Sequence, residues 1–151
     1  MGAHCARAHH QPQRVTAAFG GRILDTSALL DVATGATVYA RSLVDTATQA
    51  GLTLSVPAAA LAAAWAATGP LGRLSLDLLL EVPVVVVDPL DEPAARAVGV
   101  ALARPSVPAG SYPLELGHVV AVARGRGWPV ITAEPAQLLR LAPDLDVLTL
   151  P

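Results

Sequence analysis

The sequence predicts a three-layer α/β/α sandwich with a central, mostly parallel sheet. Short aliphatic stretches of strand length alternate along the chain with longer stretches that have helical spacing. Hydrophobic residues make up 53% of the chain and charged residues only 15%, which supplies a sizeable core. The length of 151 residues suits one domain. We place this domain at 22–151, after a loosely ordered leader at 1–21.

The first third of the domain is expected to hold one strand and two helices. A short buried strand is predicted at 23–26, directly before Ser27. Serine is a preferred helix N-cap, so Ser27 is expected to begin a helix at 28–33. Apolar residues at helical spacing predict a second helix at 37–50, and a glycine follows each helix as a stop signal.

The middle of the domain continues the alternation. A second strand is predicted at 52–56, and Pro57 suits the first turn of an alanine-rich helix that runs to about residue 67. A Gly-Pro pair then breaks the pattern, and apolar spacing predicts another helix at 71–80. Four consecutive valines at 84–87 are typical of a strand buried on both faces, as in a parallel sheet.

The last third is expected to hold three helices and two strands. Helices are predicted at 91–104 and 114–126, separated by a loop that contains Pro and Gly. A strand at 129–132, a short helix at 135–141 and a last strand at 146–150 complete the domain.

Composition excludes several kinds of chemistry. The net charge is -2, which does not indicate a nucleic-acid-binding basic surface, and the basic residues are all Arg. Without Lys the chain has neither a P-loop nor a Schiff-base site. The single cysteine, Cys5, excludes an internal disulfide and fits a cytoplasmic protein. The longest apolar stretch, 52–71, is interrupted by Pro and Gly, so no membrane span is expected.

A few polar residues are expected at the carboxyl ends of the strands, where open α/β sheets bind ligands. The first strand delivers Asp25, Thr26 and Ser27. The third delivers Asp88, followed by Asp91 and Glu92, and the fourth delivers Thr132 and Glu134. Carboxylates gathered at one edge repel each other unless a cation lies between them. Mg²⁺ and Mn²⁺ prefer such oxygen sites and can activate water for attack on a phosphodiester. Alternatively, Asp25 is only a turn or helix-cap residue.

Four stretches, in their order and spacing, resemble the PIN-domain family. This family consists of single-domain α/β proteins and includes toxin ribonucleases of toxin–antitoxin pairs. The matching stretches are 23–29, 54–57, 117–123 and 127–135. The resemblance covers nearly everything after Arg22. It implies a PIN-like α/β fold and a site built from four acids.

The resemblance also implies a degenerate acidic site. Asp25 matches the first family acid, and Glu134 matches the fourth, as Glu where Asp is usual. The second acid is missing, because the turn at 60–64 holds only Ala and Leu. The third is displaced, because the family's Asp falls nearest Leu116 and Glu115 lies about 100° away around the helix.

A metal site implied by this resemblance would use Asp25 as the principal ligand, with Glu134 and Glu115 in support. Ser27 and Thr132 would orient the cluster through hydrogen bonds. Weak binding of Mg²⁺ or Mn²⁺ is expected, because the site carries fewer carboxylates than four and the Glu side chains are longer than Asp.

Each supporting residue also has a structural interpretation. Glu134 and Glu115 lie at predicted helix starts, where a negative charge interacts favourably with the helix dipole. His118 lies in an apolar helix and is expected to be a packed, hydrogen-bonded histidine. Asp31 is expected to be a solvated surface carboxylate. Asp88 is read as a structural residue at a strand exit.

Other polar and aromatic residues are given structural roles as well. Arg124 and Arg126 end a predicted helix, where cations complement the dipole. Trp65 and Trp128 lie in apolar contexts and are expected to pack in the core or an interface. The His and Cys residues of the leader are interpreted as part of a loosely ordered tail rather than a zinc site.

Two functions follow from these observations. The first is a metal-dependent ribonuclease of reduced activity that cleaves single-stranded RNA, with a cognate antitoxin left open. The second is a catalytically silent PIN-like module that acts through protein contacts, for example as a homodimer, and the high apolar content supports it.

Overall fold

The computed structural model describes residues 20–105 and 107–151, and this part of the chain forms five strands and seven helices. The strands are β1 (Gly21–Leu24), β2 (Thr53–Pro57), β3 (Val85–Asp88), β4 (Val130–Thr132) and β5 (Val147–Thr149). The helices are α1 (Thr26–Thr34), α2 (Tyr39–Ala50), α3 (Ala58–Ala67), α4 (Pro70–Leu80), α5 (Glu92–Leu102), α6 (Leu114–Arg126) and α7 (Pro135–Leu141). The leader predicted at 1–21 lies outside the described residues except for its last two, and Gly21 already belongs to β1.

The five strands form one sheet in the order β3-β2-β1-β4-β5. Every pairing between them is parallel, so the predicted α/β class is confirmed and the described sheet is parallel throughout. In the centre, Ile23 of β1 lies opposite Ser55 of β2 and Val130 of β4. Because all strands run the same way, their carboxyl ends meet at one edge of the sheet.

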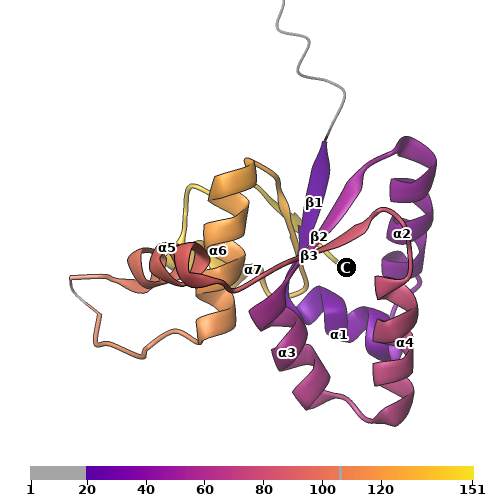
Figure 1. Cartoon of the computed structure of the whole chain (residues 1–151), viewed down its shortest axis with the longest axis horizontal. Coiled ribbons are helices and arrows are strands. Elements are labelled where there is room, and N and C mark those ends of the chain that lie inside the picture. Colours follow the sequence, from indigo (N-terminus) through magenta and orange to yellow (C-terminus); the bar gives the residue numbers. More distant parts are fainter. Residues whose placement is uncertain (1–19, 106) are drawn as a thin grey trace, which may run out of the picture.

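Helices cover both faces of the sheet, as a three-layer sandwich requires. Figure 1 shows α5 and α6 on one side and α1, α2 and α4 on the other. Helix α3 lies past the edge where the strands end, and it contacts both α1 and α6. The middle of α6, from Leu116 to Val120, is buried because this helix also packs on α5 and the sheet.

Two glycines permit close packing between neighbouring elements. A Cβ at Gly21 would come within 2.4 Å of the Trp128 ring, and one at Gly117 would come within 2.6 Å of Leu102. Gly21 therefore lets Trp128 lie against β1, and Gly117 lets α6 approach α5. Trp128 thus has the packing role predicted for it.

The prediction that the valine run is buried on both faces was wrong. β3 is an edge strand, and Val86 and Val87 are 38% and 44% exposed. Branched residues such as Val favour strands, but this preference does not encode where a strand lies in the sheet.

Within residues 20–105 and 107–151, no helix is long and apolar enough to cross a bilayer.

The start of the first helix also differs from the prediction. Asp25, rather than Ser27, is the N-cap of α1, and its Oδ1 accepts a hydrogen bond from the Ala28 N–H at 2.9 Å. Ser27 lies inside the first turn and donates to the same oxygen. Asp25 is preferred as the cap because the strand ends two residues earlier than predicted, at Leu24. The predicted helices 114–126 and 135–141 are confirmed.

Candidate functional site

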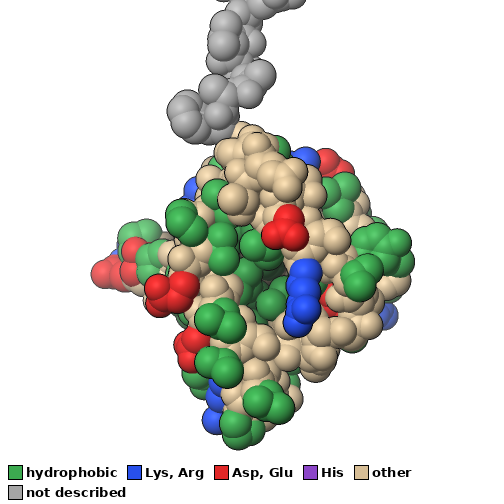
Figure 2. Space-filling view, turned by 90° about the vertical axis from the view of Figure 1, so that its right-hand side faces the viewer, with side chains coloured by type: hydrophobic (Ala, Val, Ile, Leu, Met, Phe, Trp, Pro, Cys, Tyr) green, Lys and Arg blue, Asp and Glu red, His purple; other side chains and the backbone are tan. Residues whose placement is uncertain are grey.

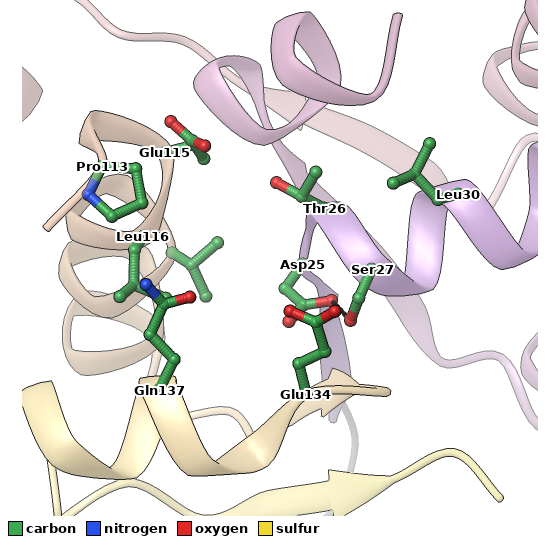
Figure 3. A pocket seen from close by; sticks show the side chains of 10 residues that line it. Asp25, Thr26, Ser27, Leu30, Pro113, Glu115, Leu116, Glu134 and Gln137 are labelled. Carbon is green, nitrogen blue, oxygen red and sulfur yellow. Dashed lines mark hydrogen bonds between the residues drawn. The ribbon is translucent and has the colours of Figure 1, made fainter. Parts of the chain in front are cut away.

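A pocket of about 150 Å³ lies at the carboxyl ends of β1 and β4. Its polar lining comes from the β1–α1 junction, the start of α6 and the start of α7. Three carboxylates line it, and neither Arg nor His is among the described residues that do so. In Figure 3 the side chains of Asp25 and Glu134 reach toward the same space, whereas Glu115 lies on the α6 wall, apart from both. The three acids predicted for the site therefore share one pocket.

Asp25 is held firmly at the end of the central strand. Only 7% of the residue is exposed, and its Oδ1 accepts hydrogen bonds from the Ser27 hydroxyl at 2.7 Å and the Ala28 N–H at 2.9 Å. Burial raises the pKa of the Asp25 carboxyl, and hydrogen bonds from Ser27, Thr132 and Ala28 counteract only part of that rise. Asp25 is thus both a helix cap and a buried acid whose negative charge lacks a cationic neighbour in the pocket.

Ser27 and Thr132 connect the ends of β1 and β4. The two hydroxyl oxygens lie 3.2 Å apart, and the Ser27 oxygen also accepts from the Ala133 N–H at 2.8 Å. The Thr132 hydroxyl accepts from the Glu134 N–H at 2.9 Å. This network fixes the backbone of Glu134 relative to the Asp25 carboxylate, which is the orienting geometry expected of the two hydroxyls.

Glu134 and Glu115 are less constrained than Asp25. Glu134 is the N-cap residue of α7, but its side chain makes no capping hydrogen bond and is exposed. Glu115 lies in the first turn of α6 and is half-buried, while its neighbour Leu116 packs inward with 9% exposure. Helix-start positions fit the dipole interpretation for both residues, and both side chains remain free to bind other groups.

The donor set fits a divalent cation that keeps most of its water. Residues 20–105 and 107–151 contain no group of three or more His, Cys, Asp or Glu side chains placed closely enough to hold a metal ion. A cation would stabilise the charged form of a buried carboxylate that lies beside a second one, with hydroxyls behind it and no basic side chain in the described lining. Mg²⁺ is commonly bound by one or two carboxylates and several waters, so Asp25 and Glu134 would suffice for such a site.

One polar residue of the pocket escaped the sequence interpretation. Gln137 lies one helical turn after Glu134 and lines the pocket, as does Thr26, which the sequence placed at the end of the first strand. Figure 3 shows the Gln137 side chain extending from α7 into the pocket. The spacing of three residues from Glu134 was the available signal, because residues at that spacing share a face of a helix.

Several other acids and bases neutralise each other outside the pocket. Arg126 binds Asp88 through two hydrogen bonds of 2.6 and 3.0 Å, and Ser55 donates to the same carboxylate. Arg124 pairs with Asp144 at 2.8 Å. Both arginines therefore complete ion pairs at the helix end, beyond the dipole role predicted for them. The Arg126 guanidinium also lies 4.7 Å from the centre of the Trp128 ring.

His118 and Asp31 are both buried, which confirms one prediction and corrects another. His118 is completely enclosed, and its Nδ1 accepts a hydrogen bond from the Ala59 N–H at 3.2 Å, as expected of a packed histidine. Asp31 was predicted to be solvated, but only 8% of it is exposed and its Oδ2 accepts from the Thr37 hydroxyl at 2.7 Å. That prediction was wrong because Thr37, in the turn after α1, provides a partner close in sequence.

Comparison with known proteins shows a likeness in fold. No protein-family model matches the chain, and no curated protein matches its sequence. VapBC2 from Rickettsia felis, solved bound to a DNA fragment from their promoter, matches with a TM-score of 0.63 and 13% identity. DNA-bound VapBC from Salmonella typhimurium matches with a TM-score of 0.63 and 19% identity. Each match covers 86% of this chain and 98% of the other. The PIN-like fold predicted from the sequence is thereby confirmed.

Proposed function

We propose that this protein is a divalent-metal-dependent ribonuclease of reduced activity, which cleaves single-stranded RNA in the cytoplasm. The observation that carries the proposal is the pocket at the end of β1. A buried Asp25 shares it with Glu134, and no Arg or His of the described chain lines the walls to neutralise them. The likeness in fold to the two VapBC structures supports the proposal.

The protein's own residues would hold and orient the site. Ser27 and Ala28 both bind Oδ1 of Asp25, so the orientation of this carboxylate is set before any ligand arrives. Leu30, Leu116 and Val119 also line the pocket, and their apolar surface strengthens the attraction between a carboxylate and a cation. A bound Mg²⁺ or Mn²⁺ would supply charge neutralisation and an activated water.

Reduced activity follows from the acids that are absent or distant. The first turns of α3 offer Ala and Leu where a further carboxylate is expected, and Glu115 stands on a different wall from Asp25. A cation at Asp25 and Glu134 would therefore be held by two carboxylates and retain more water. Weak metal binding then requires a high metal concentration for cleavage.

A metal-titrated cleavage assay tests the proposal. Wild type is expected to cleave single-stranded RNA in proportion to added Mn²⁺, and Asp25→Ala is expected to be inactive at every concentration. Asp77→Ala is a matched control, because Asp77 is an exposed acid on α4, away from the pocket. Equal cleavage by wild type and Asp25→Ala would sink the proposal.

A second candidate function is a PIN-like interaction module without catalysis. The observation that favours it is a set of exposed apolar residues on α4 and directly before α2, with Leu71 at 82%, Leu78 at 62% and Val38 at 74% exposure. Figure 2 shows hydrophobic side chains gathered on this side of the molecule around a hollow. A hollow of about 380 Å³ lies between α2 and α4, lined in part by Val44, Leu78 and Val82. Apolar surface of this kind is typical of protein contacts.

A protein partner is compatible with either function. In the two similar structures the toxin VapC is bound to its antitoxin VapB and to DNA, and a cognate antitoxin is the partner we propose for this chain. A homodimer is the alternative partner. Size-exclusion chromatography with light scattering distinguishes the two, because a homodimer forms from the purified chain alone. A strict monomer whose α4 face binds no hydrophobic dye would count against the interaction module.

A further inference from the structure

Glu115 lines two hollows that differ in the rest of their lining. The first is the pocket that contains Asp25 and Glu134. The second has a volume of about 370 Å³ and lies between the start of α3 and the start of α6. Its walls are Ala58, Ala59, Ala62, Ala63, Leu90 and Leu114. Among the described residues that line these two hollows, Glu115 is the one they share, so the hollows adjoin each other at this residue.

Alanines keep the second hollow open, and a histidine fixes its wall. Ala62 is exposed at the rim, and a larger side chain there would fill the space. The start of α3 lacks a side-chain cap of its own, because its N-cap is Pro57. His118 of α6 takes over this role by accepting the Ala59 N–H at 3.2 Å. The alanine wall therefore has a defined position relative to Glu115.

The lining specifies the chemistry of a ligand. Six aliphatic residues provide an apolar surface, one carboxylate provides hydrogen-bond acceptors, and neither Arg nor His of the described chain lines this hollow. A phosphate would be repelled by Glu115, and an aliphatic group would leave the carboxylate without a partner. A flat ring with apolar faces and an amino edge satisfies both parts of the surface. Nucleobases have this character, and single-stranded RNA presents them unstacked.

We propose that this hollow, the Ala62 hollow, is a subsite for one base of the RNA substrate, with Glu115 accepting a hydrogen bond from the exocyclic amine of that base. Carboxylates accept from such amines in base recognition, and adenine, cytosine and guanine carry one. The proposal rests on the proposed ribonuclease function, because it places the base next to a phosphodiester at Asp25. It gives Glu115 a role in substrate selection in place of the metal-ligand role expected from sequence, and its position apart from Asp25 and Glu134 in Figure 3 agrees with this.

RNA binding without divalent metal tests the subsite separately from cleavage. Fluorescein-labelled decamers of adenosine and of purine riboside, which lacks only the 6-amino group, are titrated with the full chain and followed by anisotropy. Wild type is expected to bind the adenosine decamer roughly tenfold more tightly than the purine riboside decamer. The ratio of the two affinities is the readout, because removing an acid from the surface raises the affinity for any polyanion.

Three variants separate the proposed contacts. Glu115→Ala is expected to bring the affinity ratio to about one, and Glu115→Gln to retain part of it, because an amide oxygen still accepts a hydrogen bond. Ala62→Leu is expected to abolish the ratio by filling the hollow. Ala67→Leu is its matched control, since Ala67 is an exposed residue of α3 outside the hollow. Calorimetric Mn²⁺ binding is expected to be unchanged in Glu115→Ala.

The outcomes distinguish the subsite from the nuclease. A ratio near one in wild type, a ratio unaffected by Glu115→Ala, or no binding of either decamer would overturn the subsite. Loss of Mn²⁺ binding in Glu115→Ala would overturn it in favour of a metal ligand. If cleavage depends on Asp25 but Glu115→Ala leaves the affinity ratio unchanged, the subsite proposal fails and the nuclease proposal stands. If the affinity ratio depends on Glu115 but the protein cleaves no RNA, the subsite proposal stands and the nuclease proposal fails.

Discussion

Asp25 and Asp88 occupy equivalent places in the fold but have opposite electrostatic surroundings. Asp25 directly follows β1 and Asp88 ends β3, so both carboxylates lie at the carboxyl edge of the parallel sheet. Burial acts to raise the pKa of both. At Asp88 the hydrogen bonds and positive charge of Arg126, with a hydrogen bond from Ser55, outweigh burial and lower the pKa. At Asp25 only neutral donors oppose burial, and the pKa stays raised.

A neighbouring positive charge therefore decides the role of an acid at this edge of the sheet. Arg126, at the end of α6, forms an ion pair with Asp88, at the end of β3, and neutralises its charge. Asp88 therefore acts as a structural residue. Asp25 has no such partner in the described chain and is available to an external cation. Substitutions of the two acids should consequently have opposite effects on activity and stability.

Exchanging each carboxylate for an amide should give the largest effect. Asp25→Asn is expected to reduce Mn²⁺-stimulated cleavage roughly 100-fold or more, because a metal ligand supplies several kcal/mol of transition-state stabilisation. Its free energy of unfolding should not fall, since the amide oxygen can still accept from Ser27 and Ala28. Asp88→Asn should lose stability and keep cleavage. Cleavage assays and urea unfolding of the same samples measure both variants. If the two variants lose the same amounts of activity and stability, the proposed difference between Asp25 and Asp88 is wrong.

Removing the hydroxyl behind Asp25 should have the next largest effect. Ser27→Ala loses contacts to Asp25, Thr132 and the Ala133 N–H together. We expect cleavage to fall roughly tenfold, because groups that orient a metal ligand typically contribute that much or more. Ser27→Thr keeps a hydroxyl and should retain most of the activity. Metal-saturated cleavage rates measure this, and equal rates for Ser27→Ala and wild type would mean that the network does not orient the site.

Breaking the internal ion pair should affect stability alone. Arg126→Ala is expected to lower the free energy of unfolding by about 1–2 kcal/mol, because the pair with Asp88 is bidentate and only partly exposed. The more exposed Arg124–Asp144 pair provides the control, and Arg124→Ala should lower the free energy of unfolding by much less. Urea unfolding compares the two. A loss of cleavage in folded Arg126→Ala would show that this pair is not purely structural.

The smallest expected effect is a dependence of stability on pH through His118. Burial lowers the pKa of His118 below its ordinary value of 6.5, and the charges of Asp88 and Asp91 oppose burial only in part. A histidine whose folded pKa is depressed contributes stability above its unfolded pKa and loses it as the pH falls. Protonation would also remove the acceptor for the Ala59 N–H.

Melting temperatures between pH 7 and pH 5 test this effect. Wild type should lose stability as the pH falls through this range, whereas His118→Leu should be less stable throughout and less dependent on pH. A fall of equal size in both proteins would assign the pH dependence to other groups.

Local sequence was sufficient for most elements and for the identity of the acids in the pocket. Asp25 could be located because an aliphatic strand leads directly into a helical pattern, and Glu134 because the same transition recurs after β4. The edge position of β3 could not be predicted, since four valines satisfy β-propensity at the centre and at the edge alike. The pair of Asp88 and Arg126 joins residues 38 positions apart, and no local pattern encodes such a contact.

The most direct test of the difference between Asp25 and Asp88 is anomalous scattering from a crystal soaked in Mn²⁺. If Asp25 binds a divalent cation and Asp88 does not, an anomalous peak should lie within bonding distance of Asp25, on the side of Glu134, with none at Asp88. The absence of a peak at Asp25 under saturating Mn²⁺, or a peak at Asp88, would contradict the central claim.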